Sequence, residues 1–348
     1  MTFAPDAQPL TTEFIVVGDI MVDTFAQIDG PLTIGVDHFG HVTRRIGGQA
    51  ANTAAWLASL GKPVRLLTAS GDDDDGAWAR SLLESAGVVN FQVASERALA
   101  QGLAQASTGR CVVVVDSEGS RTMISAPGAN RRLADLGADG WTDLWKTVQG
   151  TGESPAEERS PRRHLHLSGY LMHHSPDLPG VITRSARSAW PSISTSFDAA
   201  AASPTPGIQQ AFVELLPELD LVFATSQEIL DLHPPGADAS AGPVPEDDAE
   251  SLLDRWRAST GYTGTVVLKL GARGAVGDSG DGADRVRIDA PSVQVVDTTG
   301  AGDAFAAGFL AAWVPGQNRL TEAMVAGAES ASRAISRIGA GPPTTEGR

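Results

Sequence analysis

A regular alternation of short apolar runs with helix-like stretches is the feature that most constrains the fold of this chain. Residues 14–17, Phe-Ile-Val-Val, end at a glycine, as expected for a buried parallel strand. Strands that alternate with helices predict βαβ units and therefore a mainly parallel sheet. Further strands are expected at residues 65–68, 112–115, 164–167, 221–223, 265–270 and 293–296. Helices are expected at residues 49–60, 77–86, 179–190, 209–216, 249–259 and 320–338.

Two segments interrupt this rhythm. Residues 25–45 and about 100–125 have strand and turn character but show no helical pattern. We expect them to pair into a small sheet, a lid over the carboxyl ends of the main strands, where open α/β sheets bind ligands. The expected organisation is a domain over residues 13–340 with a lid from about 24–45 and 100–125, surface loops at 150–161 and 233–248, and flexible tails at 1–12 and 341–348.

The composition argues against several classes of partner. The 348-residue chain has 26 Lys and Arg against 42 Asp and Glu, a formal net charge of −16. No basic stripe exists to neutralise phosphates, so we expect neither a nucleic acid nor an anionic membrane as partner. The single cysteine, Cys111, allows no intrachain disulfide and no cysteine-based zinc site. No apolar run approaches the ~20 residues that cross a bilayer, and no secretion signal is seen, so we expect a cytoplasmic protein.

A glycine-rich turn connects the last expected strand to an apolar, helix-like run at 304–313 that has the character of a buried helix. Its sequence is Asp297-Thr298-Thr299-Gly300-Ala301-Gly302-Asp303. A turn that opens a helix presents N–H groups without intrahelical partners at the positive end of the helix dipole, and so attracts anions. Asp303 would repel an anion, so we expect it to take a proton from a hydroxyl that attacks a phosphoryl group. The structural alternative is a tight turn with the aspartate as a helix cap.

Two common phosphate-binding motifs are absent from the sequence. The only Gly-Lys pair, Gly61-Lys62, is followed by Pro63, so the chain has no Walker loop. In the turn at 297–303, Phe305 stands where a Rossmann fingerprint would place its third glycine. The expected anion site therefore belongs to neither class of nucleotide-binding loop.

Two polar clusters nearer the amino end have the chemistry to bind a polyol. Gly47 and Gly48 precede a helix of small residues and would let a ligand approach backbone N–H groups. Asn52, one turn into that helix, offers both a donor and acceptors. Asp23 follows the first strand, where its carboxylate can accept hydrogen bonds from two vicinal hydroxyls. The alternatives are helix capping with close packing for the first cluster and a turn acid for Asp23, while Asp19 is expected to be structural.

The candidate metal and phosphate ligands each have a plain alternative. Glu228, after the expected strand 221–223, would hold hydrated Mg²⁺ or serve as an acid at a helix N-terminus. Lys269 lies in an interior-looking run and is either a phosphate ligand or a partly solvated strand residue. Gly271 opens a tight hairpin or turn that would border a nucleotide. The acid-rich loop 71–76 is expected to favour the next helix N-terminus rather than to bind a metal.

Together these pieces resemble the ribokinase-like (phosphofructokinase-B) family of carbohydrate kinases. Gly47-Gly48-Gln49-Ala50-Ala51-Asn52 is similar to the first family signature, and the turn at 297–303 matches the second throughout. Three shorter pieces fall between them in the family's order: Ala126-Pro127-Gly128-Ala129-Asn130, His166-Leu167-Ser168-Gly169-Tyr170 and Leu270-Gly271-Ala272-Arg273-Gly274. The resemblance runs from about residue 14 to residue 339.

The resemblance implies a three-layer α/β/α sandwich with a small β-sheet lid. It implies transfer of the γ-phosphoryl group of ATP to a hydroxymethyl group of a sugar or sugar-like substrate. The cofactors would be ATP and Mg²⁺, with a monovalent cation such as K⁺ as a further candidate, and a homodimer through the lid is a further expectation. The implied catalytic residues are Asp303 as the base, with Gly300, Ala301 and Gly302 as the anion hole. The substrate would be bound by Asp23, Gly47, Gly48 and Asn52. The nucleotide would be bound by Lys269, Gly271, Thr298, Gly300 and Gly302, and the metal by Glu228 and Asp297.

One departure from the family pattern concerns the magnesium region. The family has N-x-x-E there, whereas this chain has Thr225 in place of the asparagine and retains Glu228. A hydroxyl can still hold a metal-bound water, so we expect activity. Gln49 and Ala50 in the first signature leave the choice between ribose, fructose and other substrates open. A nucleoside kinase on the same fold and a sugar-binding protein without catalysis remain as alternatives.

Overall fold

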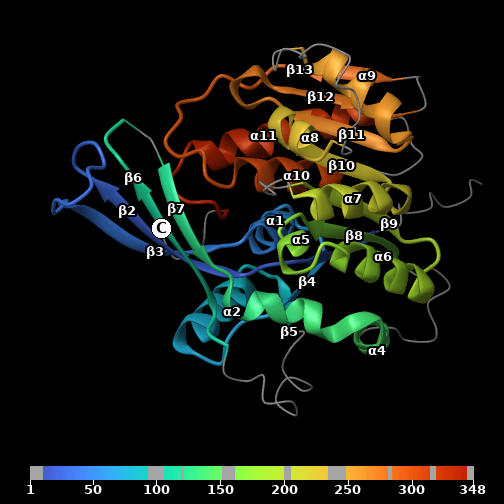
Figure 1. The fold of residues 1–348 in the computed structure, drawn as a ribbon, viewed down its shortest axis with the longest axis horizontal. Helices are drawn as coiled ribbons and strands as arrows, with labels where there is room; N and C mark the ends of the chain where they lie inside the picture. Colours follow the sequence, from blue (N-terminus) through green and yellow to red (C-terminus); the bar gives the residue numbers. More distant parts are fainter. Residues whose placement is uncertain are drawn as a thin grey trace, which may run out of the picture.

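Two sheets organise the chain in the computed structural model (Figure 1). The larger has nine strands in the order β13-β12-β11-β10-β9-β8-β1-β4-β5. Its pairs are parallel except at one edge, where β11–β12 and β12–β13 are antiparallel. The strands are β1 (Thr12–Val17), β4 (Val64–Thr68), β5 (Val89–Gln92), β8 (Arg162–Ser168), β9 (Ser194–Asp198), β10 (Leu221–Thr225), β11 (Thr265–Lys269), β12 (Ala275–Asp278) and β13 (Arg285–Ile288). The described residues are 11–92, 106–118, 121–150, 161–199, 205–233, 248–280, 284–313 and 319–342.

Helices cover both faces of this sheet and form one apolar core with each face (Figure 1). The three-layer α/β/α arrangement expected from the sequence is therefore confirmed. One face is covered by α1 (Gln49–Ser59), α2 (Asp74–Ser85), α10 (Ala301–Ala312) and α11 (Leu320–Ile335). The other face carries α4 (Gly137–Gly150), α5 (Leu171–His174), α6 (Leu178–Ala189), α7 (Pro206–Leu215), α8 (Ser226–Asp231) and α9 (Ala249–Thr260), with the short 3-10 turns η2 (Gly128–Leu136) and η3 (Leu216–Glu218). None of the helices in the described ranges has the length and apolar character needed to span a membrane.

The smaller sheet has four strands in the order β3-β2-β6-β7 and stands away from the main body (Figure 1). Its strands are β2 (Met21–Ile28), β3 (Gly40–Gly47), β6 (Gly109–Val115) and β7 (Arg121–Ala126). The pairing register places Asp23, Phe25, Arg45 and Arg121 on one face, which we call the inner face. The separate small sheet expected from the two segments without helices is thus present.

The acid-rich loop before α2 fastens this smaller sheet to the main body. Asp73 caps α2 by accepting a hydrogen bond of 2.8 Å from the N–H of Gly76. Asp75, in the first turn, lies 3.1 Å from Arg44 of β3 and 2.6 Å from Arg110 of β6. The expected helix role of these acids is confirmed, and no cluster of potential metal ligands is found among the described residues.

The expected strand at 293–296 is wrong. This segment has no strand structure, and the N–H groups of Val296 and Asp297 donate to the carbonyl oxygen of Ile335 at the end of α11 (2.7 and 3.2 Å). Val295 is 58% exposed, so the β-branched run packs into no core. The β12–β13 hairpin occupies the sheet edge instead. The apolar pattern of the sequence did not predict the strands of this hairpin.

Several of the expected tails and loops fall wholly or partly outside the described residues. β1 begins at Thr12, inside the stretch expected to be a tail. Residues 1–10 and 343–348 of the expected tails lie outside the described residues. The same holds for most of the expected loops at 150–161 and 233–248, and for residues 100–105 and 119–120 of the expected lid segment.

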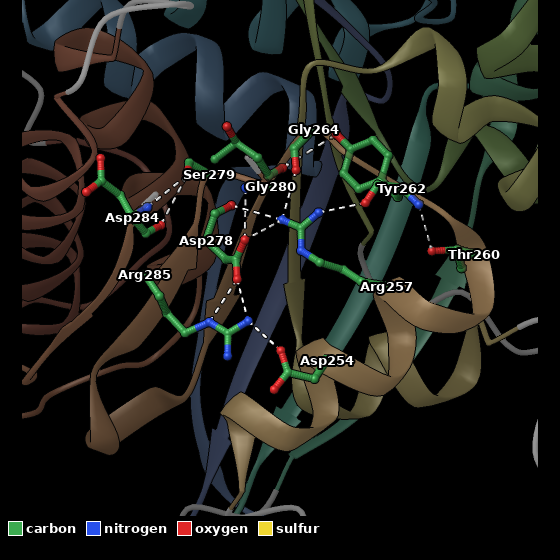
Figure 2. A network of polar contacts seen from close by, with 11 residues as sticks. Asp254, Arg257, Thr260, Tyr262, Gly264, Asp278, Ser279, Gly280, Asp284 and Arg285 are labelled. Carbon is green, nitrogen blue, oxygen red and sulfur yellow. Dashed lines mark hydrogen bonds and ion pairs between the residues drawn. The ribbon is translucent and has the colours of Figure 1, made fainter. Parts of the chain in front are cut away.

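A network of ion pairs ties the β12–β13 hairpin to α9 (Figure 2). Asp278 is nearly buried, and its Oδ1 lies 2.8 Å from Nη2 of Arg257. Its Oδ2 accepts a hydrogen bond of 2.8 Å from Nε of Arg285. Arg257 also donates to the carbonyl oxygens of Tyr262 and Gly264, at 2.7 and 2.9 Å. The guanidinium of Arg257 is thereby fixed between the helix and the edge of the sheet.

Replacing Asp278 with Asn should lower the free energy of unfolding by about 3 kcal/mol, because it leaves the largely buried Arg257 without its anionic partner. The matched control Asp254→Asn, which removes a 65% exposed partner of Arg285, should cost less than about 1 kcal/mol. Denaturant unfolding at pH 7 measures both losses, and equal losses would contradict this account of the network.

The pH dependence of this loss has a definite sign. Burial opposes the charge on Asp278, but the hydrogen bonds from Arg285 and the charge of Arg257 outweigh it and lower the pKa of this carboxyl. Its stabilising contribution is therefore complete above the unfolded-state value of about 4 and is lost as the pH falls through the lower folded-state pKa. The difference between wild type and Asp278→Asn should shrink accordingly in acid.

Candidate active site

The candidate residues gather at the carboxyl ends of the parallel strands, next to the smaller sheet. Asp198, Thr225 and Lys269 are the last residues of β9, β10 and β11. Thr225 pairs with Lys269 in register, and Phe223 of β10 pairs with Asp198. Asp23 follows the end of β1 and lies on β2. Ligands of open α/β sheets bind at this edge.

The glycine-rich turn forms the start of α10 at this edge. The helix begins at Ala301, rather than at 304 as expected, so Asp303 lies in its first turn. Gly300 is the N-cap residue with φ +73°, and a Cβ there would lie 2.5 Å from the Cβ of Ala340, so only glycine fits. In the described part of the chain the N–H groups of Gly300 and Gly302 have no acceptor, while that of Ala301 lies 3.4 Å from the Thr298 oxygen. Amides in this position can bind an anion.

The carboxylate of Asp303 is held by a residue of helix α1, which lies near the amino end of the chain. Its Oδ2 accepts a hydrogen bond of 2.8 Å from Nδ2 of Asn52 in α1. Burial raises the pKa of Asp303 to about 7, against the lowering effect of the Asn52 hydrogen bond. The charge of Asp198 raises this pKa further, and that of Lys269 lowers it. A carboxyl that titrates near neutrality can accept a proton from a substrate and release it again.

Lys269 supplies a positive charge beside the turn. Its Nζ lies 2.7 and 2.8 Å from the two carboxylate oxygens of the fully buried Asp198. A Cβ at Gly302 would stand 3.3 Å from the same Nζ. Burial opposes the charge on Lys269, but Asp198, Glu228 and Asp303 outweigh it and raise its pKa, so it remains a cation. Sequence reasoning missed Asp198, because the polar run Ser194–Asp198 was not recognised as a strand.

The two glycines of the first signature make room for different groups: Gly47 for the carboxylate of Asp23, and Gly48 for the backbone of Asp19. A Cβ at Gly47 would stand 2.1 Å from Oδ2 of Asp23, and one at Gly48, where φ is +96°, would stand 2.5 Å from the carbonyl oxygen of Asp19. Burial raises the pKa of Asp23 to about 6, with a further rise from Asp19 and a lowering effect from Arg45. Oδ1 of Asp23 is buried and has no hydrogen-bond partner in the described ranges. The structure thus brings Asp23, Gly47 and Gly48 into one cluster.

Thr225 and Glu228 form a capping box at the start of α8. The N–H of Glu228 donates to Oγ1 of Thr225 (3.2 Å), and the N–H of Thr225 donates to Oε2 of Glu228 (2.7 Å). The threonine that departs from the family pattern therefore has a structural role. Among the described residues Oε1 of Glu228 makes no hydrogen bond, so it is available to a ligand.

The carboxylate of Asp297 is already fully engaged. Its Oδ1 accepts hydrogen bonds from the N–H and Oγ1 of Thr299 (2.9 and 2.7 Å), and Oδ2 accepts one from the N–H of Gly339 (2.9 Å). Arg45 and Arg121 approach it to 3.6 and 3.9 Å. Burial opposes its charge, but the Thr299 and Gly339 hydrogen bonds, with Arg121, outweigh it and lower the pKa. Two flanking guanidinium groups make Asp297 a poor ligand for a further cation.

The remaining candidates, Thr298 and Gly271, lie at the border of this cluster. Oγ1 of Thr298 accepts a hydrogen bond from Nη2 of Arg121. Gly271 opens the 3-10 turn η4 (Gly271–Arg273) that joins β11 to the antiparallel β12, so of the expected hairpin or turn the structure has the hairpin. No atom lies within 4 Å of a Cβ built at Gly271, which therefore faces open space.

Comparisons with known proteins find sugar and nucleoside kinases. The ATP-dependent ribose-1-phosphate kinase of Halopiger xanaduensis is 29% identical over 300 residues, 85% of this chain and 80% of the relative. The adenosine kinase of Dictyostelium discoideum is 27% identical over 307 residues, 86% of this chain and 82% of the relative. The ribokinase structure from Giardia lamblia matches the fold with a TM-score of 0.72 at 18% identity, over 95% of this chain and 96% of that one.

A family model covers almost the whole chain. The model of the pfkB family carbohydrate kinases matches residues 11–346. The two relatives are named as kinases of a sugar phosphate and of a nucleoside, and the ribokinase structure shares the fold of this chain. The chain belongs to the pfkB family of carbohydrate kinases, ATP-dependent phosphotransferases that act on a sugar or a nucleoside.

Proposed function

We propose that this protein transfers the γ-phosphoryl group of ATP to a hydroxymethyl group of a sugar or sugar-like substrate. The observation that carries the proposal is the position of Asp303. Asp303 lies in the first turn of α10, beside the amides of Gly300 and Gly302, which have no partner in the described residues. Its carboxylate is held by a hydrogen bond from Asn52 of α1. A base and an anion site in such proximity suit in-line phosphoryl transfer to a hydroxyl.

In this mechanism Asp23 and Asn52 bind substrate hydroxyls, and Gly47 and Gly48 let the sugar approach the backbone. Asp303 orients the attacking hydroxyl and accepts its proton. The amides of the turn from Gly300 to Gly302, together with the ammonium of Lys269, stabilise the charge on the phosphoryl oxygens. We propose that the smaller sheet, about residues 24–45 and 100–125, is a lid that excludes water while the substrate is bound.

Mg²⁺ fits this site with a single protein carboxylate. Oε1 of Glu228 is available at the end of β10, and Mg²⁺ is commonly held by one or two carboxylates together with substrate phosphates. Bound with ATP, the metal ion would supply neutralisation of phosphate charge. We do not assign K⁺ to Asp297, because Arg45 and Arg121 already flank that carboxylate. A cytoplasmic location, with its supply of ATP, is part of the proposal.

A sugar suits the inner face of the lid better than a nucleoside does. Phe25 is the aromatic side chain beside Asp23 on this face, and the guanidinium carbon of Arg45 lies 4.5 Å from its ring centre. The ring is therefore covered on that side and offers a nucleobase less surface for stacking. The relative named a ribose-1-phosphate kinase is in keeping with this preference, whereas the adenosine kinase keeps the nucleoside alternative open.

We propose further that two copies of the chain pair through their lids. Val42, Val112 and Ile124 lie on the face opposite Asp23 and are 65%, 40% and 67% exposed. Phe39 and Ile34, between β2 and β3, are 81% and 100% exposed. Apolar side chains gathered in this way mark an interaction surface.

Asp303→Asn should reduce kcat by about a thousandfold or more, because the amide cannot accept the proton of the attacking hydroxyl. Sugar affinity should stay within about threefold, since Asp23 and the Gly47–Gly48 turn are unchanged. ADP release under Mg-ATP measures the first effect and titration calorimetry the second. Near-normal turnover in the variant would remove Asp303 from the mechanism.

The pH profile should have an acidic limb near pH 7. Only the deprotonated carboxylate of Asp303 accepts a proton, so kcat/KM should rise as the pH increases through its pKa of about 7. Asn52→Leu removes the hydrogen bond that favours the charged form and should move this limb to higher pH. Initial rates between pH 5 and 9 test both statements, and a limb that stays in place in the variant would assign it to another group.

Introducing charge on the apolar face should produce monomers. Val42→Glu combined with Ile124→Glu places two carboxylates where the proposed interface is apolar. Light scattering after size exclusion should give a dimer for the wild type and a monomer for this variant. Met123→Glu, a 57% exposed site on the inner face, is the matched control and should remain dimeric. A monomeric wild type would contradict the proposal.

A further inference from the structure

The inner face of the lid carries three buried polar atoms without hydrogen-bond partners in the described residues. They are Oδ1 of Asp23, Oγ1 of Thr43 and Nη1 of Arg45. Buried polar atoms are normally satisfied, so a cluster of unsatisfied ones requires an explanation. One acceptor, one hydroxyl and one cationic donor together form a set that a polar ligand would complete.

The strand register places these three residues on the same face of two paired strands. Asp23 pairs directly with Arg45, and Phe25 pairs with Thr43 on the same two strands. Arg45 is held over the ring of Phe25 at 4.5 Å, which fixes its guanidinium against the sheet. Its apolar stem and its charge are therefore positioned before any ligand arrives.

A second arginine approaches the same place from the far strand of the lid. Arg121 begins β7 and donates to Oγ1 of Thr299 at 3.1 Å. Both Arg45 and Arg121 lie within 4.0 Å of Asp297, at 3.6 and 3.9 Å. Asp297 lies beside both guanidinium groups, and Asp23 is a second carboxylate near Arg45. Nη1 of Arg45, the atom 3.6 Å from Asp297, still makes no hydrogen bond in the described residues, so this charged donor can bind a further anionic group. Burial lowers the pKa of Arg45, although the charges of Asp297 and Asp23 favour its cationic form.

We propose that the substrate is an anionic sugar, a sugar phosphate or a sugar acid, whose anionic group binds Arg45. Thr43 and Arg121 lie beside that group, and Asp23 accepts hydrogen bonds from the sugar hydroxyls. The planar guanidinium suits both anions because it can donate two parallel hydrogen bonds to phosphate or carboxylate oxygens. This inference rests on the proposed kinase function and specifies its substrate class.

Matched pairs of sugars test the proposal with the wild-type enzyme. ADP release from Mg-ATP is measured with ribose against ribose 1-phosphate, and with glucose against gluconate. At least one anionic member should show a kcat/KM about 30-fold or more above its neutral partner. The pair that shows the preference distinguishes a phosphate substrate from a carboxylate substrate.

Variants on β3 locate the effect. Arg45→Met keeps the apolar stem on Phe25 and should raise KM for the anionic sugar about 30-fold, with KM for ATP and for the neutral sugar within about threefold. Arg45→Lys, which keeps the charge, should recover part of the loss. Arg44→Met is the matched control, because Arg44 is adjacent in sequence but on the opposite face, where it contacts Asp75 and Trp78.

The outcomes separate this inference from the kinase function. Turnover of neutral and anionic sugars with equal kcat/KM would overturn the inference and leave the kinase function intact. A rise in KM for ATP in Arg45→Met, with the neutral sugar as acceptor, would overturn it by assigning Arg45 to the nucleotide. In a further outcome, the anionic sugar binds the wild type in calorimetry and fails to bind Arg45→Met although no sugar is turned over. That result would support the inference and contradict only the kinase function.

Discussion

The hydrogen bond from Asn52 to Asp303 joins helix α1, near the amino end of the chain, to helix α10, near its carboxyl end. The proposed base is therefore positioned by a contact between residues 251 positions apart. The same helix α1 also supports the turn before α10. Nε1 of Trp56 donates to the carbonyl oxygen of Ala340 at 2.8 Å, and Ala340 packs against Gly300. Both the carboxylate and the amides of the site thus depend on α1.

Helix α10 is suited to carry the site because it is closely packed. It is apolar almost all round and is buried between the sheet and α11. Glycines let α10 and α11 approach closely: a Cβ at Gly308 would stand 2.4 Å from the carbonyl oxygen of Ala326, and one at Gly327 would stand 3.0 Å from the ring of Phe305. The first turn of α10 lies at the carboxyl edge of the sheet, where a Cβ at Gly302 would stand 3.3 Å from Nζ of Lys269 at the end of β11. A reactive group at the end of a closely packed helix has little freedom to leave its geometry.

The sequence predicts those parts of the fold and site that local patterns specify. The alternation of strands and helices, the separate small sheet, the cap of α2 and the turn at 297–303 follow from short stretches of residues. Ion pairs between distant strands cannot be predicted in this way. The pairing of Lys269 with Asp198 joins two strands, and the approach of Arg45 to Asp297 joins β3 to the turn before α10, so both arise from tertiary contacts between segments that are distant in the sequence.

The errors at the sheet edge have the same origin. Residues 293–296 have the β-branched composition of a strand, but the β12–β13 hairpin occupies the edge and leaves this segment bonded to the end of α11. Residues 275–278, Ala-Val-Gly-Asp, pair in the sheet although their composition gives no strand signal. The replacement of asparagine by Thr225 was visible in the sequence, yet its meaning required the hydrogen bonds of the capping box with Glu228.

The central claim is that Asp303 and the turn before it form the site of phosphoryl transfer. A crystal structure with Mg²⁺, a non-hydrolysable ATP analogue and the sugar that is turned over tests this claim most directly. The account predicts a sugar hydroxyl oxygen about 3 Å from the carboxylate of Asp303 and the terminal phosphate against the amides of Gly300, Ala301 and Gly302. A terminal phosphate bound away from this turn, or an Asp303 carboxylate that contacts no hydroxyl, would contradict it.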